Sequence, residues 1–208
     1  MNILVFGATG ATGQQVVKQA LSRGHRVTAF VRRPEALESA DNLRIVVGDT
    51  TRDKSKVAEA MSGQELVISA LGRRNSFRSD HLISRSMEAI VPSMERAGVG
   101  RMILMSSFGV GESLRHAPLI PGIMFRVLLR GIFADKESAE RALRASGLDW
   151  TIVHPVLLTN GPLTGRYRVG ERLDLRGIPK ISRADVAHFI LTEIENRAFV
   201  QKVAVISY

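Results

Sequence analysis

The sequence predicts an α/β protein with a doubly wound parallel sheet. Three observations support this: apolar runs of strand length recur along the chain, helical patterns separate them, and glycines follow the first run. The runs are apolar at consecutive positions, which is typical of parallel strands buried on both faces. Strands that alternate with helices form a sheet that helices cover on both sides. Ligands of such sheets bind beyond the carboxyl ends of the strands.

The elements follow one another regularly until the last quarter of the chain. Apolar runs predict strands at 3–6, 27–31, 45–47, 66–70, 102–105, 150–153 and 203–206. Helical spacing predicts a helix ending before Gly24, others around 57–61, 80–97 and 134–146, and one beginning at Ser182, with Gly147 and Asp185 at cap positions. Residues 166–175 predict either a short extra strand or an exposed arm. No repeat or linker divides residues 1–208, so we expect a single domain.

Composition narrows the classes of partner. The chain has 29 Lys and Arg against 20 Asp and Glu, and this charge of +9 favours anionic partners such as a nucleotide cofactor. The arginines are scattered rather than grouped, so we expect no nucleic acid as a partner. The apolar stretches are interrupted, so we expect no membrane span. Without a cysteine or a signal-peptide pattern, a cytoplasmic location is expected.

Glycines at positions 7, 10 and 13 stand between the first strand and the first helix. Gly7 permits a sharp turn, Gly10 lets the backbone approach a pyrophosphate, and Gly13 lets the helix pack on the strand. The free N–H groups of the helix start attract phosphate. This context predicts a Rossmann-type domain whose cofactor-binding residues include Gly7, Thr9, Gly10, Ala11, Thr12 and Gly13.

The end of the second strand indicates which dinucleotide binds. An acidic residue there would hold the ribose hydroxyls of NAD, whereas this chain has Arg32 and Arg33. The guanidinium group of Arg32 matches a 2′-phosphate, so NADP(H) is favoured over NAD(H). The alternatives are that these arginines form a solvated basic turn and that Glu35 reaches the ribose.

Residues after the third and fourth strands are further candidates for cofactor binding. Asp49 is placed to accept the adenine amino hydrogen or to cap a helix. Leu71 and Gly72 would let the backbone pass close to the cofactor ribose. Arg74 lies near the phosphates in this interpretation, or is merely solvated.

The fifth and sixth strands end in polar residues that predict the catalytic end of the site. Ser107 is placed to donate a hydrogen bond to a substrate, or to start a loop. Lys136 would bridge the nicotinamide ribose, or pair with Glu140 in solvent. His154 and Pro155 occupy a cofactor-side position, although a histidine satisfied by backbone contacts is the alternative. The histidines show no metal spacing, so no metal is expected.

Residues 108–133 form a longer connection than a compact domain normally needs. Long connections of this kind are usually functional, which predicts a helical flap over the nicotinamide end. A satellite core or a dimer contact is the alternative, and monomer and homodimer both stay open. Met124, Phe125 and Leu128 are the residues expected to face the substrate or a partner.

Taken together, these residues resemble the atypical short-chain dehydrogenase/reductases, specifically their NmrA-like NAD(P)-binding branch, which includes NADPH-dependent flavin and biliverdin reductases. The matching segments are 6–13, 31–32, 47–49, 71–72, 74–75, Ser107, 146–148 and 162–167. The resemblance implies a reductase that delivers hydride from NADPH to a flat conjugated acceptor such as a flavin, a quinone or a tetrapyrrole.

The chain departs from that resemblance at two places. Ile132 stands where the superfamily's catalytic tyrosine precedes the lysine, which disfavours carbonyl reduction with tyrosine as the proton donor. Leu157 and Leu158 after the sixth strand offer no titratable group to a tetrapyrrole. An NADPH-dependent oxidoreductase is therefore the leading hypothesis, and a non-catalytic NADP(H)-sensing or scaffold protein is the second.

Overall fold

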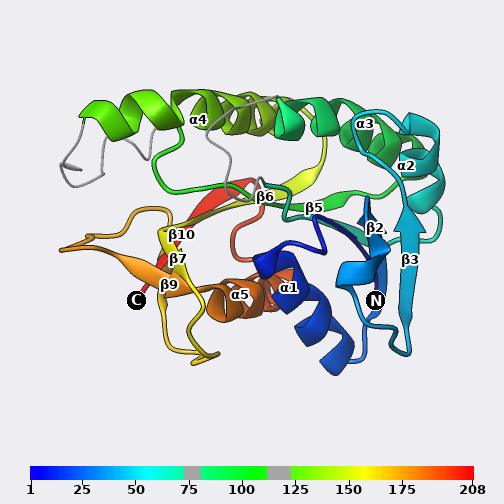
Figure 1. The fold of residues 1–208 in the computed structure, drawn as a ribbon, viewed down its shortest axis with the longest axis horizontal. Helices are drawn as coiled ribbons and strands as arrows, with labels where there is room; N and C mark the ends of the chain where they lie inside the picture. The colour runs from blue at the N-terminus through cyan, green and yellow to red at the C-terminus, as the bar shows by residue number, and fades with distance from the viewer. Residues whose placement is uncertain (73–80, 112–122) are drawn as a thin grey trace.

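A computed structural model describes residues 1–72, 81–111 and 123–208 of the chain. In this part of the chain an eight-stranded sheet forms the centre of the molecule, and β8 is antiparallel to its neighbour β10 while the other strands are parallel (Figure 1). In spatial order the strands are β3 (Leu43–Val47), β2 (Arg26–Val31), β1 (Asn2–Phe6), β4 (Leu66–Ser69), β5 (Arg101–Met105), β6 (Asp149–Pro155), β10 (Lys202–Ser207) and β8 (Arg168–Gly170).

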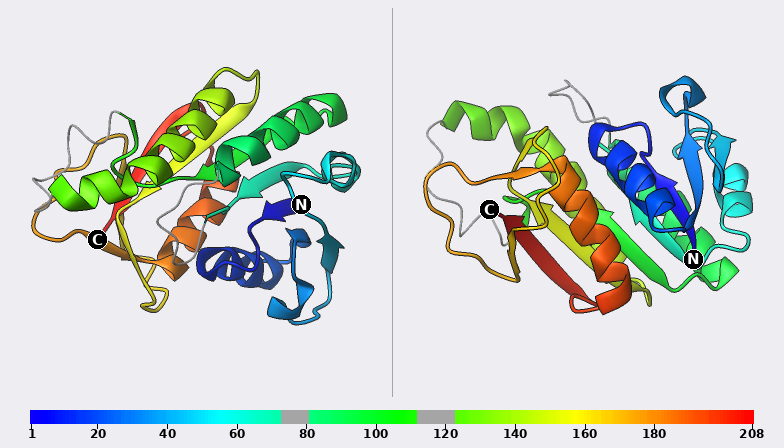
Figure 2. Two further views of the ribbon diagram at one scale, coloured as in Figure 1. Left: turned by 45° about the horizontal axis from the view of Figure 1, so that its top comes forward. Right: turned by 90° about the horizontal axis from the view of Figure 1, so that it is seen from below.

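Helices cover both faces of the sheet, which confirms the predicted doubly wound fold. One face carries α1 (Ala11–Ser22) and α5 (Arg183–Asn196), and the other carries α2 (Lys54–Ala60), α3 (Leu82–Ala97) and α4 (Ile123–Arg144) (Figures 1 and 2). A 3-10 turn, η1 (Pro34–Ala36), follows β2. In the described residues, no helix combines the length and apolar character needed to cross a membrane.

Successive side chains of each strand point to opposite faces of the sheet, so the core consists of two clusters, one on each face. Ile3 and Val5 of β1 pack with residues of α1 and α5, whereas Leu4 and Phe6 pack with residues of α2 and α3. All four side chains are fully buried, as expected for a central parallel strand whose successive side chains point to opposite faces.

The last quarter of the chain adds strands that the sequence pattern predicts only in part. One of the two alternatives for 166–175, the short extra strand, is present as β8. The pattern did not predict β7 (Leu157–Thr159) and β9 (Lys180–Ser182), which pair with each other in a separate parallel ribbon. Three-residue strands are too short for alternation to be recognised.

Helix α4 differs from the predicted helix at both ends. It begins at Ile123, so the second part of the connection 108–133 belongs to the same helix. It ends at Arg144, and Gly147, expected as its cap, lies three residues further on. Residues 112–122 of the predicted flap, and the side chains of Met124, Phe125 and Leu128, lie outside the described part of the structure.

Asp135 fastens α4 to the start of α3. Its carboxylate accepts hydrogen bonds from the backbone N–H groups of Ile83 and Ser84, at 3.0 and 2.9 Å, and from the Ser84 hydroxyl at 2.6 Å. These N–H groups belong to the first turn of α3, where no carbonyl of the helix itself can accept them. The buried carboxylate thus replaces a local N-cap and places α4 beside α3.

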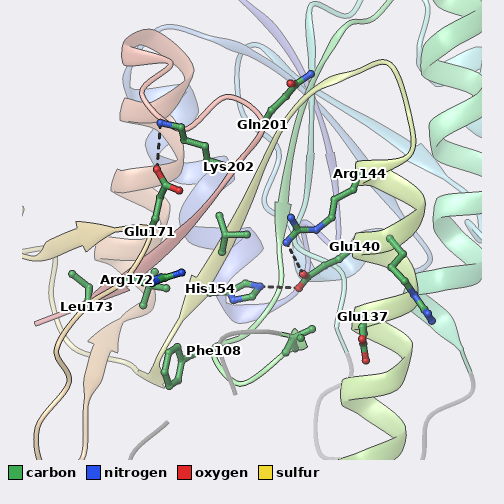
Figure 3. Close-up of a pocket in the computed structure, with 15 residues that line it drawn as sticks. Phe108, Glu137, Glu140, Arg144, His154, Glu171, Arg172, Leu173, Gln201 and Lys202 are labelled. Atoms are coloured by element: carbon green, nitrogen blue, oxygen red, sulfur yellow. Dashed lines mark hydrogen bonds and ion pairs between the residues drawn. The ribbon is translucent and has the colours of Figure 1, made fainter. Parts of the chain in front are cut away.

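A cavity of about 490 Å³ lies between α4 and β10 (Figure 3). Val203 and Val205 of β10 line it from the sheet, and Arg144 lines it from α4. Lys202 and Glu171, which form a 3.3 Å ion pair, also line it. The cavity therefore combines an apolar floor with a charged rim.

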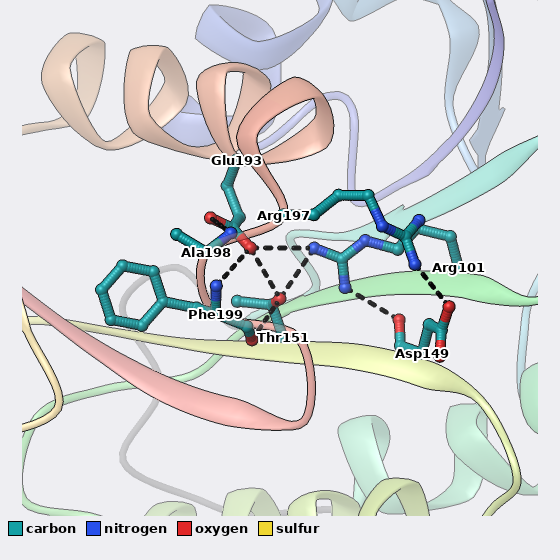
Figure 4. A network of polar contacts seen from close by, with 7 residues as sticks. All are labelled: Arg101, Asp149, Thr151, Glu193, Arg197, Ala198 and Phe199. Atoms are coloured by element: carbon teal, nitrogen blue, oxygen red, sulfur yellow. Dashed lines mark hydrogen bonds and ion pairs between the residues drawn. The ribbon is translucent and has the colours of Figure 1, made fainter.

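A buried polar network joins β5, β6 and α5 at the amino ends of the strands (Figure 4). The guanidinium group of Arg101 donates to the Asp149 carbonyl and the Thr151 hydroxyl, both at 2.8 Å. It also pairs with the Glu193 carboxylate at 3.2 Å, and the two side chains are 7% and 1% exposed. The Glu193 carboxylate accepts the Phe199 backbone N–H at 2.8 Å.

We expect Arg101→Ala to lower the free energy of unfolding by about 3–5 kcal/mol, because it leaves the Glu193 carboxylate buried without its cationic partner. Denaturant unfolding followed by circular dichroism measures this loss. Arg176→Ala is the control, since Arg176 and Asp174 form an ion pair whose side chains are 90% and 77% exposed, and such pairs contribute little. Equal losses in the two variants would contradict the role assigned to the network.

Candidate functional site

The glycine turn has the geometry that its sequence predicts. Gly7 has a φ of +76°, and a Cβ added there would lie 2.5 Å from the Ala70 carbonyl oxygen. A Cβ added at Gly13 would lie 2.1 Å from the Gly7 carbonyl oxygen, far inside contact distance. The Gly10 N–H closes the turn by donating to the same Gly7 oxygen at 3.0 Å. Glycine is thus required at both ends of the turn.

At this turn, the first backbone N–H groups of α1 have no hydrogen-bond partner among the described residues. Its first helical hydrogen bond runs from the Gln14 N–H to the Gly10 carbonyl at 2.8 Å, so the N–H groups of Ala11, Thr12 and Gly13 precede it. Gly10 is the N-cap and supplies no side-chain acceptor. The Thr12 side chain is buried and that of Thr9 half-buried, which leaves Thr9 the more accessible hydroxyl. This open, positively polarised helix start fits a pyrophosphate.

Arg32 and Asp49 come together where β2 and β3 end. The two strands pair with Val31 opposite Val47, and the exposed Arg32 follows directly. Asp49 accepts from the Thr51 N–H at 2.8 Å and the Thr51 hydroxyl at 2.7 Å. The hydrogen bond from the Thr51 hydroxyl lowers the pKa of Asp49 below its usual value. The Arg32 charge contributes to this shift, and burial opposes it. Asp53, not Asp49, occupies the N-cap position of α2, and the Asp49 carboxylate binds Thr51 in the preceding turn.

The end of β4 lies against the glycine turn. The same hypothetical Cβ at Gly7 would lie 2.8 Å from the Leu71 backbone nitrogen, so the two loops touch through their backbones. Gly72 is exposed beside them. Arg74, the third candidate from this segment, lies outside the described residues.

The predicted pair Ser107 and Lys136 is in direct contact. The Lys136 ammonium group donates to the Ser107 hydroxyl oxygen and, at 3.3 Å, to the Ser106 carbonyl. The solvated alternative for Lys136 is therefore wrong, because its side chain folds back from α4 onto the end of β5. Burial lowers the pKa of Lys136 to about 8, even though Glu140 and Asp135 oppose this shift. An amine of that pKa can exchange a proton near neutral pH.

His154 is held by a side chain rather than by the backbone. Its Nε2–H donates to the Glu140 carboxylate at 2.8 Å, and the imidazole is 2% exposed (Figure 3). The alternative that backbone contacts satisfy this histidine is wrong, and its predicted contact with the cofactor stays a prediction. Pro155 ends β6, and its carbonyl accepts the Phe108 N–H at 3.0 Å, which ties the ends of β5 and β6 together.

Sequence reasoning missed three buried residues of this region: Ser106, Asp135 and Glu140. Glu140 was considered as an exposed partner of Lys136, but it is 3% exposed and its carboxylate accepts the Ser106 hydroxyl at 2.5 Å. Helical spacing identifies residues on one face, and it does not tell a buried charged face from a solvated one. Within the described residues, no group of three His, Asp or Glu is arranged to hold a metal ion.

The fold and the glycine turn define a class of protein: a Rossmann-type α/β protein with a glycine-rich turn between β1 and α1. A family model described as NAD(P)H-binding matches residues 7–197. The chain belongs to this NAD(P)H-binding family.

Known relatives cover much of the chain. An uncharacterised chloroplastic protein of Arabidopsis thaliana is 33% identical over 174 residues, which are 78% of this chain and 61% of that protein. An uncharacterised sugar epimerase of Bacillus subtilis, YhfK, is 29% identical and covers 96% of this chain and 92% of its own. ChuY, an anaerobilin reductase from Escherichia coli O157:H7, is 27% identical in sequence, and its solved structure superimposes with a TM-score of 0.84. The match covers 99% of this chain and 96% of ChuY.

We expect Gly13→Ala to weaken NADPH binding at least about tenfold and to destabilise the fold by about 1–3 kcal/mol, because the new methyl group forces α1 away from the turn. Fluorescence titration and thermal unfolding measure the two effects. Gly100→Ala serves as the control, since a Cβ at Gly100 meets nothing within 4 Å. Unchanged NADPH affinity in Gly13→Ala would show that the helix start does not bind the cofactor.

Proposed function

We propose that this protein is an NADPH-dependent reductase that delivers hydride to a flat conjugated acceptor of the flavin, quinone or tetrapyrrole type. The observation that carries the proposal is the contact between Lys136 and Ser107 at the carboxyl end of β5. Ligands of doubly wound sheets bind at this edge, two strands from the glycine turn of β1. The likeness to an anaerobilin reductase supports a conjugated acceptor.

The chain's own residues supply the proton and the orientation. NADPH, when bound, supplies a hydride, and the acceptor takes up that hydride and one proton while NADP⁺ is left. The Ser107 hydroxyl donates a hydrogen bond to the acceptor and transfers the proton, and the Lys136 ammonium group replaces it. A rise in pH through about 8 removes the proton from Lys136, so the rate falls on the alkaline side.

Isoleucine instead of tyrosine at position 132 supports a conjugated acceptor. Reduction of a simple carbonyl creates an alkoxide that needs a strong proton donor at the reacting oxygen, which tyrosine provides in the wider superfamily. A conjugated ring system spreads the negative charge over several atoms, so a hydrogen bond from Ser107 suffices to stabilise it. The site as built therefore favours conjugated acceptors over ketones.

A screen of acceptors tests the proposal. Purified protein with NADPH should reduce at least one flavin, quinone or linear tetrapyrrole faster than buffer does, followed as the loss of NADPH absorbance. Ser107→Ala should lower kcat about 100-fold, as loss of a transition-state hydrogen bond does, while NADPH affinity is kept; the exposed Ser62 provides the control Ser62→Ala. Tight NADPH binding without turnover of any acceptor would favour the cofactor-sensing protein instead.

Arg32 is proposed to select NADPH over NADH through the 2′-phosphate. Arg32→Glu should weaken NADPH binding at least tenfold more than NADH binding, about 1.4 kcal/mol, because attraction to the phosphate becomes repulsion. Titration with each cofactor measures the two dissociation constants. Arg44→Glu makes the same charge change at an exposed position of β3 and should leave their ratio unchanged. Equal losses for both cofactors in Arg32→Glu would refute its assignment.

A further inference from the structure

Glu140 is a buried carboxylate for which the proposed reaction gives no direct task. It lies on α4 one helical turn after Lys136 and is 3% exposed. Burying a charged carboxylate costs free energy unless hydrogen bonds and opposite charges satisfy it. Its position beside the candidate catalytic pair therefore needs an explanation.

Three elements converge on this carboxylate. From β5, the Ser106 hydroxyl donates to Oε1 at 2.5 Å, and from β6, the His154 Nε2–H donates to the same oxygen at 2.8 Å. From α4 itself, the Arg144 guanidinium group pairs with Oε2 at 3.5 Å (Figure 3). Burial raises the pKa of Glu140, but the hydrogen bonds and the Arg144 charge together lower it below the usual value, so the group is ionised.

The same turn of β5 is held at a second point by Lys136. The ammonium group donates to the Ser106 carbonyl and to the Ser107 hydroxyl. Glu140 therefore fixes the side chain of Ser106 while Lys136 fixes its backbone and the neighbouring side chain. The two α4 residues thus hold the pair of serines that directly follows β5.

The carboxylates of Asp135 and Glu140 both act electrostatically on Lys136. Their hydrogen-bond partners differ. Asp135 accepts three hydrogen bonds from the first turn of α3. Glu140, one helical turn after Lys136 on α4, accepts hydrogen bonds from Ser106 and His154 at the ends of β5 and β6. Both oppose the effect of burial on Lys136, with Glu140 the stronger.

We propose that Glu140 is a positioning residue of the candidate site, whose carboxylate anchors the Ser106–Ser107 turn to α4 and supplies the negative charge that stabilises protonated Lys136. This inference rests on the proposed function for its kinetic consequence. Its electrostatic part concerns Lys136 alone and can be measured without turnover.

The test compares Glu140→Gln with the wild type. The amide has nearly the same shape but no charge, so Lys136 should lose its proton about 1 pH unit lower. Trace labelling of Lys136 with acetic anhydride across a pH series, followed by mass spectrometry, gives the midpoint directly. In the acceptor assay, the alkaline decline of kcat should move in the same direction by the same amount.

Matched variants separate charge from shape. Glu137→Gln removes the same charge from an exposed neighbour on α4, and it should leave the Lys136 midpoint unchanged. Glu140→Asp keeps the charge and should restore a midpoint near that of the wild type. Ser106→Ala keeps the carboxylate but removes the anchor, so it should retain the midpoint while kcat falls about tenfold.

The outcomes distinguish this inference from the proposed function. A Lys136 midpoint that is equal in wild type and Glu140→Gln overturns the inference, even if an acceptor is reduced. A shifted midpoint with no acceptor turnover supports the electrostatic role and refutes the reductase. NADPH binding and thermal unfolding show whether Glu140→Gln folds, and if it does not, Ser106→Ala tests the anchoring role. A kcat of Ser106→Ala equal to that of the wild type would overturn this role.

Discussion

The site depends on how closely the first helix approaches the first strand. Gly13 lies so near the Gly7 carbonyl that no side chain fits between them, and this contact sets the direction in which α1 leaves the turn. The N–H groups at the helix start then point at the edge where the parallel strands end. The backbone provides these donors, so their direction depends on the packing of α1 against the sheet and not on the rotamer of any side chain.

Sequence patterns predicted the main sheet because its strands are apolar on both faces and its helices are amphipathic. The glycine turn was also predictable from local sequence. Gly7 allows the positive φ of the turn, and Gly13 leaves room for α1 to approach the turn. Buried charge was not predictable in this way. Glu140 and Asp135 have the spacing of solvated helix residues, and their partners come from β5, β6 and α3, which only the folded chain brings near.

The short ribbon of β7 and β9 and the full length of α4 show the same limit. Three-residue strands carry too little periodicity to be distinguished from a loop. The first half of α4 contains Gly131 and a dense mixture of apolar residues, which obscures its helical face. For the site, Ser107 and Lys136 were predicted separately from strand ends and helix spacing, whereas their contact required the docking of α4 on β5.

The contact between Asp135 and the first turn of α3 also bears on the order of folding. The carboxylate and the N–H groups that it binds are 51 and 52 positions apart in the chain, so closing this loop costs entropy that a local cap would not. The first turn of α3 therefore acquires its acceptor only when α4 docks. The ordering of this turn and the docking of α4 are thus energetically coupled, although the two elements are far apart in the sequence.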